Sequence, residues 1–216
     1  MKPVALLLGF EPFGGDDINP SQRIVEALDG ETIADHVVLA CTLPTEFART
    51  PDLLGELIER HAPALVLAIG QAGGRSGISI ERVAINVIDA RIADNAGDQP
   101  FDVPVIDGGP NAYFSTLPIK AMLRALHEER IPASISNTAG TFVCNQVFYA
   151  LAHLIATRHP RLRGGFVHVP YLPEQAQRLG GAPWLDLPTM VEATRLCLRV
   201  ALSAKEDLHF AAGTTH

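Results

Sequence analysis

Short apolar runs, separated by segments rich in turn residues, recur along the whole chain. The runs that predict buried strands are 4–10, 36–44, 64–70, 78–87, 133–136 and 164–170. Most of them are apolar on both faces, which is typical of strands in a parallel sheet covered on both sides. The run 78–87 differs, because Ile78 and Ile80 alternate with Ser79 and Glu81. That alternation predicts a strand with one polar face.

Segments with helical periodicity lie between these runs. Asn19 and Pro20 have the types favoured at a helix cap and at the first helical position, and Thr50-Pro51 repeats the signal. Helices are expected from Pro20 through the stripe Ile24, Val25 and Leu28, and over 52–61, 117–130, 144–159 and 188–205. Residues 89–112 form the longest irregular stretch, and loops of such length are often functional or mobile. The sequence leaves open whether this loop closes over a ligand.

The alternation of strand and helix predicts an α/β fold with an open, mostly parallel, twisted sheet and helices on both faces. Without a repeat or a linker, residues 1–216 are expected to form a single domain, with a tail disordered from about residue 206. Ligands of such sheets gather at the carboxyl ends of the strands. The loops after Phe10, Gly70, Ser136 and Val169 are therefore expected to share one rim.

Composition and charge narrow the class of protein. A net charge of −7 argues against a nucleic-acid partner, because such proteins usually carry a basic surface. The three cysteines are far apart and form no CxxC pair or zinc-ligand cluster, which predicts no metal site and suits the reducing cytoplasm. The apolar run Val4 to Leu8 lacks a cleavage site and is too short for a secretory signal. No run approaches a membrane span, so no membrane association is expected.

The stretch SISNTAGTFVCNQ, residues 134–146, places a lone cysteine where a helix is expected to begin. The free N–H groups and the dipole at that helix end would stabilise a thiolate and lower the pKa of Cys144. The alternative is a thiol that merely fills space in the core. Core packing is favoured for Cys41, inside a strand, and for Cys197, on a helix face.

A thiol nucleophile needs a base, and a carboxylate usually orients that base. Of the eight histidines, His168 stands out as a lone imidazole within the apolar strand FVHVP, although a core histidine is an open alternative. Glu81 is the acid of the run 78–87. Its alternative is a place on an exposed edge strand, or an ion pair with Arg75 or Arg82.

Two long patterns resemble a known family. GQAGGRSGISIERVAIN (70–86) and SNTAGTFVCNQ (136–146), supported by GFEPFGG (9–15) and FVHVPYLPEQ (166–175), are similar to segments of the pyroglutamyl-peptidase I family, the pyrrolidone-carboxylate peptidases. The resemblance implies a cysteine exopeptidase in which Cys144 is the nucleophile, His168 the base and Glu81 the group that orients it. It further implies removal of an N-terminal pyroglutamyl residue from peptides through a thioester, no cofactor, an open α/β fold and commonly a homotetramer.

A pyroglutamyl end is a flat, uncharged lactam, so its pocket should be apolar with a few amide-like partners. The candidate pocket residues are Phe10 and Phe13 for the ring faces, Asn19 and Gln71 for hydrogen bonds, and Phe142 and Val143 for the wall. The candidate oxyanion donors are the N–H of Cys144 and the side chain of Arg91. Core packing is the alternative for each phenylalanine, and helix capping is the alternative for Asn19.

Two other functions compete with the peptidase. A phosphate-using transferase, such as a nucleoside phosphorylase, would bind an anion on the backbone of GQAGGRSG. A non-catalytic binding module would keep all three thiols buried and inert.

Overall fold

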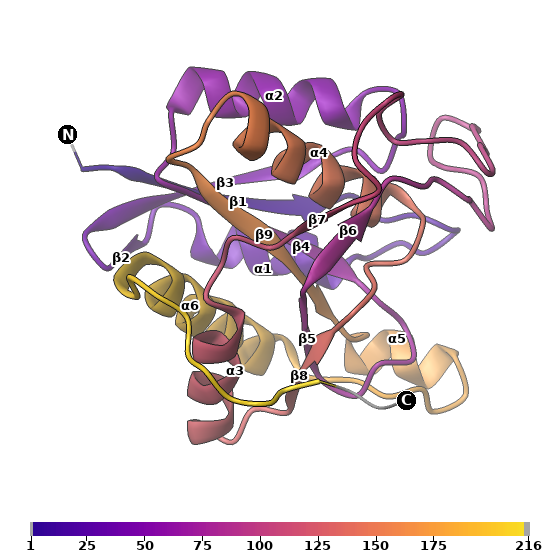
Figure 1. Ribbon diagram of the computed structural model, residues 1–216. Helices are drawn as coiled ribbons and strands as arrows, with labels where there is room; N and C mark the ends of the chain where they lie inside the picture. The colour runs from indigo at the N-terminus through magenta and orange to yellow at the C-terminus, as the bar shows by residue number, and fades with distance from the viewer. Residues whose placement is uncertain (1, 214–216) are drawn as a thin grey trace.

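The computed structural model describes residues 2–213, which form a mixed seven-stranded sheet and a two-stranded sheet with helices packed around them (Figure 1). The strands are β1 (Val4–Phe10), β2 (Thr32–Ile33), β3 (His36–Leu43), β4 (Leu65–Gln71), β5 (Ile78–Glu81), β6 (Val83–Ile85), β7 (Ala112–Phe114), β8 (Ala133–Ser136) and β9 (Arg163–Val169). The helices are α1 (Pro20–Leu28), α2 (Thr50–His61), α3 (Ile119–Glu128), α4 (Val143–Thr157), α5 (Pro173–Arg178) and α6 (Leu187–Ser203). The expected α/β class is confirmed.

The large sheet separates two apolar layers. Figure 1 shows α2 and α4 on one face and α1, α3 and α6 on the other. Leu6 and Leu8 of β1 pack with α2 and α4, whereas Leu7 packs with the opposite set. Because successive side chains of a strand point to opposite faces, an all-apolar run such as β1 is what a sheet covered on both sides requires.

The strand order is β2-β3-β1-β4-β9-β5-β8. Strands β1, β3, β4 and β9 run parallel, but β5 is antiparallel to β9 and β8 runs with β5. The sheet is therefore mostly parallel, as expected, but both of its edges are reversed, since β2 is also antiparallel to β3, and the sequence predicted neither reversal. The reversal at β5 follows from the short connection 72–77 between β4 and β5, since a parallel return needs a crossover of a dozen or more residues.

The run 78–87 is not the single strand that its pattern predicts. It divides at Arg82 into β5, which joins the large sheet, and β6, which pairs with β7. The face expected to be polar and solvated is also buried, because Ser79 is 4% exposed and Glu81 is 0% exposed. The polar positions of this strand mark a buried site, not the surface.

Residues 86–111 are irregular, as expected, but side-chain hydrogen bonds hold them in place. The Asn86 amide donates to the carbonyls of Ile106 and Gly109 and accepts from the N–H of Ile106. The short elements β2, β7 and α5 were missed, because they are too brief to show a periodic pattern.

The tail was expected to be disordered from about residue 206. Over 206–213 it is irregular but attached, since the carboxylate of Asp207 accepts hydrogen bonds from the N–H groups of Lys120 and Ala121 at the start of α3. Residues 214–216 lie outside the described range. Within residues 2–213, no helix is both long and apolar enough to cross a membrane.

Candidate active site

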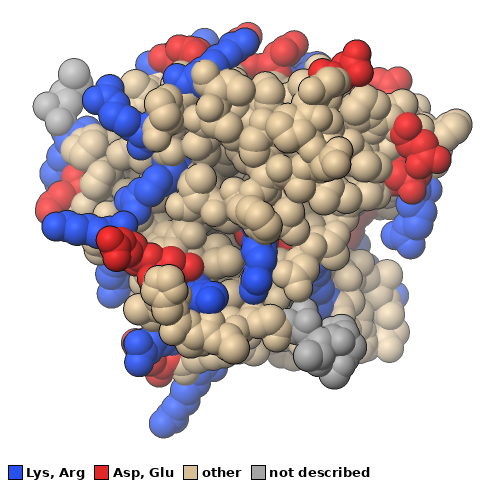
Figure 2. Space-filling view, viewed as in Figure 1, with Lys and Arg blue, Asp and Glu red and all other residues tan. Residues whose placement is uncertain are grey.

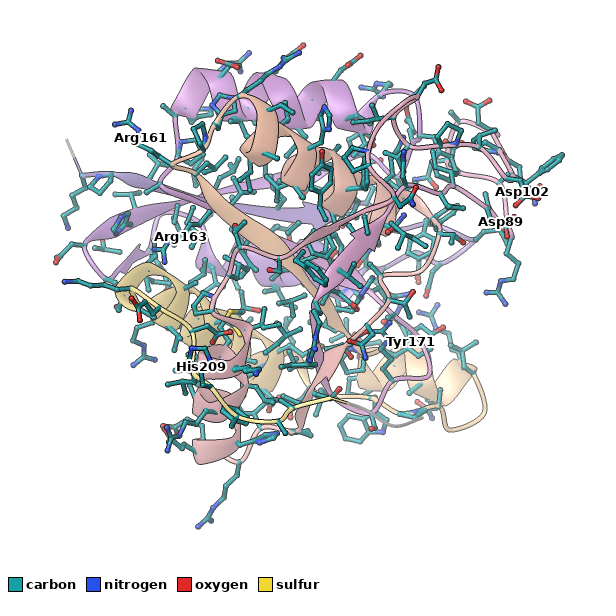
Figure 3. The ribbon with its side chains drawn as sticks, in the orientation of Figure 1. Asp89, Asp102, Arg161, Arg163, Tyr171 and His209 are labelled. Atoms are coloured by element: carbon teal, nitrogen blue, oxygen red, sulfur yellow. The ribbon has the colours of Figure 1, made fainter. Side chains whose placement is uncertain are left out.

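The loops after β1, β4 and β9 meet at the carboxyl-end rim of the large sheet, as the sequence predicts. The loop after β8 reaches the same place from a strand that runs the other way, so its position does not follow from the sequence. The four loops surround a cavity of about 1120 Å³. Its lining includes Phe13 and Asp16 after β1, Gln71 at the end of β4 and Arg75 after it, Gly140 and Phe142 after β8, and Tyr171 and Gln175 after β9. Figure 3 shows two further landmarks on the right of the molecule, Tyr171 next to α5 and Asp89 in the long irregular segment. The cavity has room for a ring and part of a peptide chain.

The thiol of Cys144 lies in the first turn of α4 and is half-buried. Space for it exists because residue 70 is glycine. A Cβ atom on Gly70 would lie 2.7 Å from Cys144 Sγ and 2.9 Å from the ring of Phe166. The sulfur therefore occupies the position that a side chain at residue 70 would take, at the mouth of the cavity.

That position is next to His168. Gly70 and His168 are direct partners in the parallel pairing of β4 and β9, so their side-chain directions lie on the same face of the sheet. Neighbouring strands are about 4.8 Å apart, which places the imidazole beside the sulfur. Cys144 and His168 both line the cavity. The sheet register thus brings together two residues that are distant in the sequence.

Glu81 holds the far side of the imidazole. Its Oε1 atom is 2.7 Å from His168 Nδ1. A carboxylate only accepts hydrogen bonds, so Nδ1 carries the proton and Nε2 of the neutral ring is left as an acceptor. Ser79, two residues earlier, pairs with His168 across β5 and β9, which sets the diagonal approach of Glu81. This geometry leaves the imidazole able to receive a proton.

Arg75 completes the group and was not predicted to have a role beyond an ion pair. Its Nη1 lies 2.6 Å from Glu81 Oε1, and its Nη2 donates to the carbonyl of Thr138 at 3.0 Å. The second carboxylate oxygen, Glu81 Oε2, has no hydrogen-bond partner among the described residues. The guanidinium compensates the buried charge of Glu81 and ties it to the loop that leads to Cys144. The two alternatives for Glu81, orienting carboxylate and ion-pair partner, are therefore both found.

The charges of the resting thiol and imidazole differ from the expectation. Burial, followed by the negative charge of Glu81, raises the pKa of Cys144 to about 12, so the lowering expected from the helix end is outweighed. Burial also lowers the pKa of His168, although the hydrogen bond that the imidazole donates to Glu81 opposes this shift. The thiol and the imidazole are both neutral at rest.

The candidate pocket residues divide into two sets. Phe13, Gln71 and Phe142 line the cavity, and the rings of Phe13 and Phe142 have centroids 5.9 Å apart. Phe10 and Val143 do not line it. Phe10 is 2% exposed and packs on Phe166. Val143 is 0% exposed and lies in the apolar layer between the large sheet and helices α2 and α4.

Asn19 also lies outside the cavity lining, and its side chain already has partners. Its Oδ1 accepts from the N–H and the hydroxyl of Ser21, and its Nδ2 donates to the carbonyl of Glu11. It is the helix cap that the sequence allowed as an alternative. Its second role is to hold the loop after β1, from which Phe13 projects.

The two oxyanion candidates come from different segments of the chain. The N–H of Cys144 belongs to the first turn of α4, where backbone donors have no partner within the helix. Arg91 is exposed and lines the cavity from the long irregular segment. The structure also brings in Asp16, Tyr171 and Gln175, which sequence reasoning missed. Asp16 lies in the segment GFEPFGGDD, and Tyr171 and Gln175 lie in YLPEQ. Both segments could have pointed to these residues, but neither has a periodic pattern that singles out a side chain.

The other thiols are not placed for chemistry. Burial raises the pKa of Cys197 to about 12 and also raises that of Cys41. In the part of the chain that the structure describes, no cluster of histidine, cysteine and acidic side chains could hold a metal ion.

A thiol at a helix start, beside an imidazole that is held by a buried carboxylate, defines a cysteine-dependent hydrolase. Comparison with known proteins narrows the class. The family model described as pyroglutamyl peptidase matches residues 4–204, and the chain belongs to this family. A pyrrolidone-carboxylate peptidase of Cupriavidus taiwanensis is 55% identical over 216 residues, with 99% of this chain and 100% of the relative covered. One of Bacillus cereus is 50% identical over 216 residues, and both chains are fully covered.

Solved structures agree with the sequences. The crystal structure of pyroglutamyl peptidase I from Bacillus amyloliquefaciens superimposes with a TM-score of 0.95 at 42% identity, covering 98% of this chain and 100% of that one. A mutant pyrrolidone carboxyl peptidase from Pyrococcus furiosus gives a TM-score of 0.89 at 45% identity, covering 92% and 98%. The family resemblance of the two long sequence patterns is confirmed. Family membership also sets aside the phosphate-using transferase and the non-catalytic module.

Proposed function

We propose that this chain is a cysteine exopeptidase that hydrolyses the amide bond after an N-terminal pyroglutamyl residue and releases pyroglutamate. The observation that carries the proposal is the hydrogen bond of 2.7 Å between Glu81 Oε1 and His168 Nδ1, together with the thiol of Cys144 in the lining of the same cavity as His168. Membership of the pyroglutamyl peptidase family supports the substrate class.

The reaction starts from neutral partners. As Cys144 Sγ attacks the pyroglutamyl carbonyl carbon, His168 Nε2 accepts the thiol proton, so that no free thiolate has to form in a buried site. The positive imidazolium is stabilised by Glu81. The oxyanion of the tetrahedral intermediate faces the N–H of Cys144, with Arg91 as the second donor. When the intermediate collapses, His168 gives its proton to the departing amine, and a thioester remains.

Deacylation uses the same groups in reverse. His168 takes a proton from a water molecule, the resulting hydroxide attacks the thioester carbonyl, and the sulfur leaves with the proton from the imidazolium. Pyroglutamate is released and the thiol is restored. Every proton in this cycle passes through one imidazole, so the reaction needs no metal or cofactor. Phe13 and Phe142 contact the faces of the lactam ring, and Gln71 binds its polar edge.

The test uses a pyroglutamyl chromogenic amide beside a prolyl amide as the free-amino control. The wild-type protein should cleave the first and not the second. Cys144→Ala should lose at least a thousandfold in kcat, because the nucleophile is gone, with an unchanged thermal midpoint. Cys197→Ala, which removes a thiol outside the cavity, is the matched control for activity. Full turnover by Cys144→Ala would refute the proposal.

We also propose a homo-oligomer, a tetramer as the resemblance implies, in the cytoplasm. The large apolar side chains Phe101 and Phe114 are 70% and 71% exposed. Figure 2 shows a broad uncharged area in the middle of the face on which β6 and β7 lie. Exposed apolar area of this kind marks association surfaces. Light scattering during size-exclusion chromatography should give a multiple of the 23.2 kDa chain mass. The three free thiols are consistent with a reducing compartment.

A further inference from the structure

A buried glutamine of the cavity lining contacts a second glutamine of the same lining. Gln175, in the first turn of α5, is 1% exposed. Its Oε1 accepts from the backbone N–H of Leu172 at 3.0 Å. Its Nε2 lies 2.6 Å from Asp16 Oδ2 and 2.8 Å from Gln71 Oε1. Every polar atom of this side chain therefore has a partner.

The orientation of this amide is fixed by its neighbours. A backbone N–H can only donate, so Leu172 must face the oxygen of Gln175. A carboxylate can only accept, so Asp16 must face its nitrogen. Oxygen and nitrogen of an amide are otherwise hard to tell apart, and contacts with such one-way groups are what resolves them. The side chain cannot be turned over without breaking both contacts.

The fixed amide in turn orients Gln71. Since Gln175 presents an N–H, the atom of Gln71 that faces it must be the oxygen Oε1. The NH₂ group of Gln71 then points away from Gln175. Within residues 2–213 it has no hydrogen-bond acceptor. Both glutamines line the cavity, and Gln71 is only partly buried. The site therefore presents a donor at this point.

We infer that Gln175 is a positioning residue that makes Gln71 a hydrogen-bond donor, and that this donor selects a lactam carbonyl over an unblocked amino terminus. The inference rests on the proposed function and deepens it. A lactam ring offers a carbonyl oxygen, which accepts the N–H of Gln71. An unblocked N-terminal proline has the same ring size, but a methylene group stands where the lactam has its carbonyl, and its nitrogen is an ammonium, which can only donate. The N–H of Gln71 then has no acceptor on the ligand, and an unpaired donor in a partly dry cavity disfavours binding.

The inference predicts how two substitutions combine. Gln71→Ala removes the donor, so KM for a pyroglutamyl amide and the inhibition constant of 2-pyrrolidone, a minimal lactam, should both rise roughly threefold to tenfold, the usual range for one hydrogen bond. Gln175→Met should raise them by a similar or smaller factor, because the amide of Gln71 then rotates freely. In the Gln71→Ala background, Gln175→Met should add nothing. The value of kcat should change little in all three proteins.

Further variants separate positioning from a structural role. Gln177→Met makes the same change on the exposed side of α5 and should leave KM unchanged. Gln71→Glu is isosteric and can still accept from Gln175, but it places an oxygen where the donor stood. It should therefore weaken lactam binding more than Gln71→Ala does, and it should bring binding of prolyl amide closer to that of the pyroglutamyl amide.

The outcomes are distinct. An equal effect of Gln175→Met in both backgrounds would show a structural role and overturn the inference. Lactam binding in Gln71→Glu as tight as in the wild type would overturn it too, and this comparison holds even if Gln175→Met does not fold. If the wild-type protein cleaves no pyroglutamyl amide, the proposed function itself fails. If it cleaves the amide but the combined variants are additive, only the inference about Gln175 fails.

Discussion

The neutral resting state of Cys144 and His168 is a consequence of burial at single residues. Both pKa shifts disfavour charge, one raising the pKa of the thiol to about 12 and the other lowering that of the imidazole. Arg75 enters each case as a nearby positive charge that lowers the pKa. Activity therefore depends on an unprotonated imidazole and not on a preformed thiolate.

This state predicts the shape of the pH profile. Protonated His168 cannot accept the thiol proton, so kcat/KM is lost as the pH falls through the pKa of His168. Since that pKa lies below its usual value of 6.5, the acid limb should lie below pH 6.5, without a further rise near the ordinary pKa of a thiol. Arg75→Gln removes the positive charge, which raises the pKa of His168 and should move the limb to higher pH.

The matched control is Arg23→Gln on the exposed face of α1, which should leave the limb in place. Arg75→Lys keeps the charge and should restore most of the wild-type position. Measurement requires kcat/KM between about pH 4.5 and 9. A limb that stays fixed in Arg75→Gln would show that the guanidinium only holds the loop.

The substitution Gly70→Ala gives a second prediction at the scale of single residues. A Cβ atom there would meet Cys144 Sγ at 2.7 Å, so Gly70→Ala must push the thiol away from the imidazole. A displacement of about 1 Å at a reacting atom typically costs on the order of a hundredfold in rate, so kcat should fall by that amount. Gly55→Ala on α2, where no atom lies within 4 Å of the added methyl, is the control and should keep full activity.

The sequence points to individual residues where a pattern constrains a side chain. Cys144, His168 and Glu81 stand out because each breaks an apolar pattern, and the geometry places all three at the site. The sequence could not separate Asn19 as cap from Asn19 as ligand, since both roles use the same amide. The role of Gln175 could not be predicted from its segment, because the orientation of its amide depends on Asp16, which is far away in the chain.

At the scale of elements, α4 carries more than the nucleophile. Asn145 follows Cys144 and is 0% exposed. Its Oδ1 accepts from the N–H of Ile85, and its Nδ2 donates to the carbonyls of Ile85 and Val87. The Asn145 amide thus pairs with the backbone of residues 85–87 in the way that a neighbouring strand would. It therefore fixes α4 against β6 and sets where the long irregular segment with Asp89 and Arg91 begins.

Asn145→Ala should lower the free energy of unfolding by about 2–4 kcal/mol, because buried backbone groups lose their partners. Urea denaturation followed by circular dichroism measures this loss. Asn111→Ala, at an exposed position just before β7, should change stability by less than about 0.5 kcal/mol. Equal stability of the two variants would contradict the role given to Asn145.

Element boundaries illustrate what periodicity can and cannot predict. The start of α1 follows from its cap and proline signal, since Asn19 caps the helix and Pro20 is its first residue. At α2 the signal is one residue off, because the helix already begins at Thr50 and Arg49 takes the cap position without a side-chain hydrogen bond. The division of 78–87 at Arg82 could not be predicted, because pairing partners decide it: β8 and β9 for one half and β7 for the other. Local pattern identifies a strand, and tertiary contacts decide which sheet it joins.

At the scale of the whole molecule, the alternation of strands and helices was sufficient to predict the layered α/β architecture and the rim shared by the loops after β1, β4 and β9. It was not sufficient to predict the reversed edge formed by β5 and β8. The reversal has a functional result, since it brings Glu81 diagonally opposite His168 from an antiparallel neighbour. A purely parallel sheet would not present the carboxylate at this point.

The attachment of the tail gives a prediction that separates stability from activity. The carboxylate of Asp207 accepts from the N–H groups of Lys120 and Ala121, and α3 has no side-chain cap of its own at Pro118. Asp207→Ala should therefore cost about 1–2 kcal/mol of stability, as loss of a helix cap does. No residue of α3 lines the cavity, so kcat and KM below the melting range should not change.

Glu206→Ala, which removes a carboxylate from the exposed neighbouring position, should leave the thermal midpoint unchanged. Asp207→Asn retains one acceptor oxygen, so its thermal midpoint should lie between those of Asp207→Ala and Glu206→Ala. Because the cap joins residues 120 and 207, this variant tests whether the closing segment belongs to the cooperative unit that unfolds with α3 and α6. A midpoint for Asp207→Ala equal to that of Glu206→Ala would show that the tail is bound too weakly to contribute to stability.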